Sequence, residues 1–218
     1  MCSAMAVPGT QAQDLNTRAR IRDAAIRVFG EQGFDAGVRA VATAAGVSPG
    51  LVNHHFGSKQ GLRSACDEKV LSIIVSEKKA VLTASSPARM LTALAEIEQY
   101  APLVAYLVRS FQAGGRLAAS LFEHMVAGVE TYLEAGVAEG RLRPSRDPAA
   151  RARYLTLNSL GSTLLYLQMR NEQDGSAGYG AAIRAMTDEI MLPSLEVHTE
   201  GLFVDTSMLD AYVAHEPE

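Results

Sequence analysis

The sequence has 218 residues, 48% of them hydrophobic, and a formal net charge of −4. This length suits one long domain or two short ones, and there is neither a run of about 18 apolar residues to span a membrane nor the apolar start of a signal peptide. The two cysteines, Cys2 and Cys66, are too few for a disulfide framework and match no zinc spacing. We therefore expect a cytoplasmic protein without metal or cofactor.

The charges are unevenly distributed along the chain. Residues 1–82 carry ten Lys and Arg against seven Asp and Glu, a net of +3, and residues 83–218 carry ten against seventeen, a net of −7. A basic front and an acidic remainder are typical of a DNA-binding head on a body that the DNA backbone repels.

Residues 1–15 are expected to form a disordered arm. The first predicted helix runs from Thr17 to Gln32, because its apolar residues recur at helical spacing, and Gly33 ends it. Arg18 lies in the first turn, where it can reach a phosphate. The apolar stripe consists of Ile21, Ala25, Val28 and Phe29.

Two short helices separated by a tight turn follow. The first covers residues 38–45 and ends at Gly46, since glycine adopts the left-handed backbone without penalty. The second starts at Pro49, is capped by Ser48 and ends near His55. A helix of barely two turns is marginal alone, so packing must hold it, as is typical of a recognition helix in the major groove of DNA.

The next predicted helix connects two parts of the chain. It starts after Ser58 and covers residues 59–83, long enough to leave the head and enter the body. A boundary is predicted at 85–87. We therefore assign 16–62 to a helix-turn-helix domain and 63–218 to a second helical domain.

The remaining segments also read as helices, so the predicted fold class is all-α. The polar stretch 171–180 is predicted to be a loop. The predicted helices are Arg89–Tyr100, Pro102–Ala113, Leu117–Glu139, one from a cap at Asp147 to Arg170, Ala181–Met191 stopped by Pro193, and a short amphipathic piece at Met208–Val213.

Three motifs resemble those of the tetracycline-repressor (TetR) family of bacterial regulators. They are Phe-Gly-Glu-Gln-Gly-Phe at 29–34, Ala-Ala-Gly-Val-Ser at 44–48 and His-His-Phe-Gly-Ser-Lys at 54–59. The resemblance implies a C-terminal domain that binds a ligand and forms a homodimer. Stretches 100–110 and 192–202 further resemble regulators encoded near ABC-type multidrug exporters.

By this resemblance, the protein is a repressor that binds a palindromic operator and is released by a small lipophilic or drug-like ligand. Control of multidrug efflux genes would follow from the finer resemblance. The operator, the inducer, the target genes, the choice between repression and activation and the role of residues 195–218 are not encoded in any motif.

The resemblance also assigns DNA contacts. Arg39 corresponds to an arginine that can fork onto guanine, and Lys59 to a lysine that pairs with phosphate. His55 either approaches phosphate or packs the helix end. Asn53 departs from the family's usual tyrosine, which puts that phosphate contact in doubt, although asparagine can bond adenine. The full expected set is Arg18, Val38, Arg39, Pro49, Gly50, Leu51, Asn53, His54, His55 and Lys59.

Aromatic residues and methionines recur at helical spacing in the second domain. Such stripes indicate either plain core or a ligand pocket, and the family resemblance favours a roomy apolar pocket. The expected pocket residues are Met90, Tyr100, Tyr106, Phe111, Phe122, Met125, Tyr132, Tyr166 and Met169.

The last two long helices carry more apolar surface than one core needs. Small residues beside the leucines would let a neighbouring helix approach closely, which favours a symmetric four-helix dimer interface over an internal bundle. The expected interface residues are Leu157, Leu160, Gly161, Leu164, Ile183, Met186 and Ile190.

Two other function classes, an enzyme and a protein-interaction adaptor, remain as alternatives to a DNA-binding regulator. An enzyme is disfavoured because the sequence lacks nucleophile-elbow, P-loop, zinc-protease and dinucleotide-binding patterns, and its Glu and His spacing does not fit a di-iron bundle. The alternative of a helical protein-interaction adaptor predicts that the protein shows no salt-dependent binding to DNA.

Overall fold

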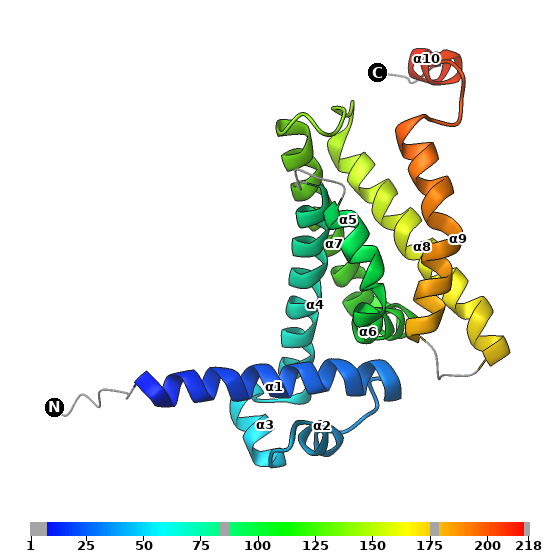
Figure 1. The fold of residues 1–218 in the computed structure, drawn as a ribbon. Helices are drawn as coiled ribbons and strands as arrows, with labels where there is room; N and C mark the ends of the chain where they lie inside the picture. The colour runs from blue at the N-terminus through cyan, green and yellow to red at the C-terminus, as the bar shows by residue number, and fades with distance from the viewer. Residues whose placement is uncertain (1–7, 83–87, 175–178, 216–218) are drawn as a thin grey trace.

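A computed structural model describes residues 8–82, 88–174 and 179–215, and every regular element in these ranges is a helix (Figure 1). The all-α prediction is thus confirmed. None of the described helices combines the length and apolarity needed to cross a membrane. The elements are α1 (Pro8–Gln32), α2 (Val38–Ala45), α3 (Pro49–Phe56), α4 (Lys59–Leu82), α5 (Ala88–Ala95), the 3₁₀ helix η1 (Ile97–Tyr100), α6 (Ala101–Gln112), α7 (Gly115–Ala138), α8 (Pro148–Asp174), α9 (Tyr179–Thr199) and α10 (Ser207–His215).

The first three helices form a head below a helical body. In Figure 1, α1 lies across the base, α2 and α3 pack beneath it, and α4 rises from the head into the body. The predicted limits of α2 hold, and Gly46 takes the left-handed backbone, with φ of 64°. The head core contains Ile21, Ala24, Ala25, Ile26, Val28, Phe29, Val41, Ala42, Ala45, Val52, Leu62, Cys66 and Val70.

The start of α1 differs from the prediction. The helix begins at Pro8, so residues 8–15 are helical and not a disordered arm; residues 1–7 lie outside the described part. The apolar stripe starts only at Ile21, and periodicity alone therefore missed the first two turns, which carry no apolar face to signal them.

The C-terminal end of α9 also differs. A stop was predicted at Pro193, but the helix continues through this residue to Thr199. Residues 192–199 are all exposed, so water can donate a hydrogen bond to the backbone carbonyl that the proline leaves without a donor. A proline inside the helix is therefore tolerated at this position.

Other boundaries differ by smaller amounts. The segment predicted as one helix at 89–100 is broken into α5 and η1, and α8 extends four residues past Arg170 into the stretch expected to be a loop. The predicted boundary at 85–87 lies outside the described residues. Asp147 caps α8 as expected, accepting a hydrogen bond from the Ala150 amide at 2.9 Å.

Candidate nucleic-acid interface

The short helix α3 presents a free face to solvent. Val52 is its one buried residue, 1% exposed in the head core, while Pro49, Gly50, Asn53 and His54 are exposed. One side of a two-turn helix is thus anchored and the other is left open. This arrangement fits a recognition helix that is held rigid by packing.

Side-chain caps fix both ends of the α3 segment. The Ser48 hydroxyl accepts a hydrogen bond from the Leu51 amide at 3.2 Å, and the Ser58 hydroxyl accepts one from the Gly61 amide at 3.0 Å. Gly61 is required at its position, because a Cβ there would collide with the carbonyl oxygen of Phe56. The turn between α3 and α4 therefore depends on a glycine that the sequence reading did not single out.

Two of the three expected cationic contacts stand exposed on the head. Arg39, at the second position of α2, and Arg18, on α1, are exposed, and the Arg18 guanidinium lies 5.0 Å from the centre of the Phe56 ring. Lys59 opens α4 and is partly exposed. These three residues come from α1, α2 and α4, the helices that contact α3 in the head.

Other expected contacts are less available. The His55 side chain is only 4% exposed, with Nε2 lying 3.7 Å from the Asp14 carboxylate. Its position favours the second expected role, an imidazole that packs the helix end. Val38 packs against the head core and Leu51 is half-buried.

A second support, besides α4, joins the head to the body. Helix α6 lies against α1 at Gly30, where a Cβ would stand 3.1 Å from that of Ala105. The Arg109 side chain donates to the Gly30 carbonyl at 3.4 Å. Because no side chain separates the two backbones at Gly30, a shift of α6 would also displace α1.

Tyr106 completes this joint. It belongs to α6 but is fully buried in the head core, and its hydroxyl donates to the Asp67 carboxylate of α4 at 2.6 Å. Burial raises the pKa of the Asp67 carboxyl, although the Tyr106 hydrogen bond and the Arg63 guanidinium act in the opposite direction. Tyr106, expected in a ligand pocket, therefore ties α6 to α4.

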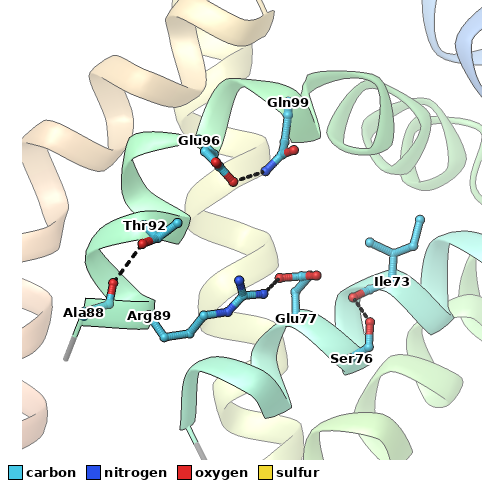
Figure 2. Close-up of polar contacts among 8 residues, drawn as sticks. All are labelled: Ile73, Ser76, Glu77, Ala88, Arg89, Thr92, Glu96 and Gln99. Atoms are coloured by element: carbon cyan, nitrogen blue, oxygen red, sulfur yellow. Dashed lines mark hydrogen bonds and ion pairs between the residues drawn. The ribbon is translucent and has the colours of Figure 1, made fainter. Parts of the chain in front are cut away.

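The upper part of α4 is held by the body. Figure 2 shows Arg89 of α5 reaching Glu77 of α4, with 2.8 Å between guanidinium and carboxylate. Burial is the largest cause that raises the pKa of the Tyr100 hydroxyl, and its hydrogen bond to Glu77 acts in the same direction. On another side, Gly128 of α7 leaves room for the side chain of Val75. Helix α4 thus touches the head with one half and the body with the other.

The nine expected pocket residues are distributed over α5, η1, α6, α7 and α8. Tyr132 packs with the cluster of Val129 and Leu133, and the Tyr166 hydroxyl donates to Glu189 of α9 at 2.9 Å. Met169 is 62% exposed. The others, Met90, Tyr100, Phe111, Phe122 and Met125, are half-buried.

A hollow of about 260 Å³ lies where α7 turns into α8, at the end of the body opposite the head. It includes none of the nine expected residues. Its walls are Glu130, Leu133, Glu134, Val137, Ala138, Pro144, Ser145, Pro148 and Arg151.

The expected dimer residues fall into two groups. Leu157 and Gly161 are exposed on α8, while Leu160, Leu164, Met186 and Ile190 are half-buried. Ile183 is 3% exposed, packed within its own chain, and so it offers no surface to a partner.

Sequence reasoning missed the joint between α1 and α6. A glycine in the middle of a helix, such as Gly30, is a signal for close approach of another backbone. It could have suggested a contact but not its partner, because Ala105 and Tyr106 lie about 75 residues further along the chain.

Comparisons with known proteins agree with this geometry. Residues 21–66 match the family model described as bacterial regulatory proteins of the tetR family, and residues 98–204 match a tetracyclin repressor-like C-terminal domain. The transcriptional regulatory protein RaaS of Mycobacterium tuberculosis is 52% identical over 204 residues, which cover 94% of this chain and 95% of RaaS.

Solved structures show the same fold. A TetR-family regulator from Pectobacterium atrosepticum has a TM-score of 0.56 at 21% identity, covering 89% of this chain and 97% of its own. FadR from Bacillus subtilis, solved with stearoyl-CoA, has a TM-score of 0.55 at 15% identity, covering 85% of this chain and 99% of its own. With its helix-turn-helix head, its helical body and a relative matched over nearly its full length, the chain is a transcriptional regulator that belongs to the tetracycline-repressor family.

Proposed function

We propose that the protein is a repressor that binds a palindromic operator as a homodimer and leaves it when a small apolar ligand binds the body. The observation that carries the proposal is the free face of α3, anchored by Val52 and flanked by Arg18, Arg39 and Lys59. One such face reads only a few base pairs. Two copies on consecutive major grooves, about 34–36 Å apart, would read a palindrome.

The head and the body differ in charge in a way that supports this orientation. Residues 1–82 have a net charge of +3 and residues 83–218 of −7. The DNA backbone attracts the first part and repels the second. The head therefore approaches DNA and the body points away from it.

The DNA contacts can be tested by three substitutions and binding measurements over a range of salt concentrations. Lys59→Ala should weaken all sequences about equally and reduce the salt slope by about one, because a phosphate contact carries no sequence information. Arg39→Ala should cost about 1–3 kcal/mol and relax specificity at one base pair. The matched control is Arg27→Ala, on the exposed side of α1, which should change neither quantity. Equal and sequence-blind losses for Arg39→Ala and Lys59→Ala would contradict these roles.

The joint gives a route for release. A ligand that shifts α6 or the upper half of α4 would move α1 through Gly30 and Tyr106, and thereby change the spacing of the two heads. Coupling free energies of about 1–3 kcal/mol are typical of such linkage. The family resemblance supports a lipophilic ligand and efflux genes as targets.

Titration of the operator complex with a panel of apolar compounds tests the release step. At least one compound should lower the affinity for the operator about 5- to 150-fold, as that coupling implies. If every compound that binds the protein leaves operator affinity unchanged, ligand release is wrong while DNA binding stands.

A further inference from the structure

The last part of the chain carries an apolar surface that its own body leaves open. We define the C-terminal arm as residues 202–215, which hold α10 and the segment before it. Every residue of the arm is exposed. The large apolar side chains in it are Leu202, Phe203, Val204, Met208, Leu209, Tyr212 and Val213, and they are between 44% and 104% exposed.

Within the arm, α10 is an amphipathic helix with a defined start. The Asp205 carboxylate accepts a hydrogen bond from the Ser207 amide at 2.9 Å, and the Thr206 hydroxyl donates to Asp210 at 2.8 Å. Met208, Leu209, Tyr212 and Val213 follow helical spacing and lie on one face. A nine-residue helix is marginal in water without packing on that face, and no other described element packs closely on α10. The covering surface must therefore come from elsewhere.

Charge limits what that surface can be. Residues 199–218 contain five Asp and Glu and neither Lys nor Arg. Such a segment is repelled by DNA and by anionic membranes. A protein surface with exposed apolar side chains and nearby arginines is the complementary partner.

A second copy of this chain offers that surface on the first half of α8. Tyr154 and Leu157 are 65% and 56% exposed, and the turn that precedes α8 carries the exposed Arg143 and Arg146. In Figure 1, the α7–α8 turn and α10 lie at the same end of the body, opposite the head.

Symmetry brings the two surfaces together. If both heads of a homodimer face one DNA duplex, the two-fold axis runs along the body, and both arms leave their α9 at the same far end. Because the α7–α8 turn lies at this end too, the first half of α8 of each copy is available there to the other copy's arm. We propose that the C-terminal arms are exchanged in the dimer, with the apolar face of α10 of each copy packed on Tyr154 and Leu157 of the other. This proposal rests on the homodimer of the proposed function.

Dimer affinity measured by sedimentation equilibrium tests the arm on the full chain. The variant Phe203→Ser/Met208→Ser/Tyr212→Ser should raise the dimer dissociation constant at least tenfold, and Tyr154→Ser, outside the expected four-helix interface, should also raise it. The matched control is Ala211→Ser/Ala214→Ser, on the opposite face of α10, which should leave the dissociation constant unchanged. Circular dichroism checks that each protein is folded, which we expect because all these side chains are exposed in the single chain. An arm variant that dimerises as tightly as the wild type would overturn the proposal.

Cross-linking then distinguishes exchange from packing within one chain. In a Cys2→Ser background, one protein carries Met208→Cys and the other Leu157→Cys; the remaining Cys66 is buried and its pKa is raised by burial to about 12, so it does not react. A short bismaleimide should join the two proteins when mixed, and should do so far less when Ala214→Cys replaces Met208→Cys. If instead the double variant Leu157→Cys/Met208→Cys forms only a link within one chain, exchange is wrong. A wild-type protein that stays monomeric would refute the proposed homodimer itself, whereas a dimer without cross-links would refute only the exchange.

Discussion

At the scale of single residues, Tyr106 has a structural role that its position in the sequence does not predict: it packs in the head core and bonds Asp67. Tyr106 lies on a stripe of aromatic residues in the body, which is why it was expected in a ligand pocket. Its ring instead fills the head core, and its hydroxyl meets a carboxylate on α4. Helical spacing predicts that a face is apolar but not which neighbour covers it.

The same pair makes the stability of the joint depend on pH. Burial raises the pKa of Asp67 above its ordinary value, so the folded chain keeps this proton to a higher pH than the unfolded chain. The stabilisation linked to the proton is complete below the unfolded pKa and is lost as the pH rises through the folded pKa. Asp67→Asn keeps an acceptor for Tyr106 without the charge. We expect its free energy of unfolding to rise relative to the wild type between pH 4 and pH 7.

Urea unfolding at several pH values checks this expectation. Glu31→Gln, an exposed carboxylate near the end of α1 that does not contribute to the Asp67 shift, is the control and should show no such trend. A wild type that gains stability over Asp67→Asn as the pH rises would show that the carboxylate is favoured in its charged form.

At the scale of elements, local signals predicted some boundaries and not others. Helix α2 has the predicted limits and α3 starts at the predicted residue, because Gly46, Ser48 and Pro49 mark these ends within one turn of the chain. Helix α3 ends at Phe56, one residue past the predicted His55. The end of α9 was missed since solvent, and not the local sequence, makes Pro193 tolerable there. The break between α5 and η1 carries neither proline nor glycine, so no local signal marks it.

Helix α8 allows a test of the proposed dimer seam. A Cβ at Gly161 would meet nothing within 4 Å in the single chain, so Gly161→Ala should stabilise the isolated fold by about 0.5–1 kcal/mol. If α8 lies close to its symmetry mate, the same methyl group should weaken the dimer. We expect a raised dimer dissociation constant together with a raised free energy of unfolding, measured by sedimentation and by urea.

The control for this test is Gly180→Ala in α9, whose added Cβ would make only ordinary contacts at 3.8 Å or more. It should leave dimer affinity unaltered. If Gly161→Ala also leaves it unaltered, α8 does not pack closely against a second copy at this position.

At the scale of the whole molecule, the sequence predicted the fold class and the two short helices of the head because both depend on short-range patterns. The uneven charge predicts that the head, and not the body, meets DNA. The pocket and the joint depend on contacts between residues far apart in the chain, such as Gly30 with Ala105 and Tyr106 with Asp67. Spacing along one helix cannot specify such contacts, so it grouped Tyr106 with the other aromatic and methionine residues of the body.

Tyr106 also changes where the chain can be divided. An excised fragment ending with α4 would keep all three helices of the head and yet lack the ring that plugs its interior. Such a fragment would have a void bordered by Phe34 and opened to water. The head of this chain is therefore not self-contained, because one of the side chains that fill its interior is supplied by the body.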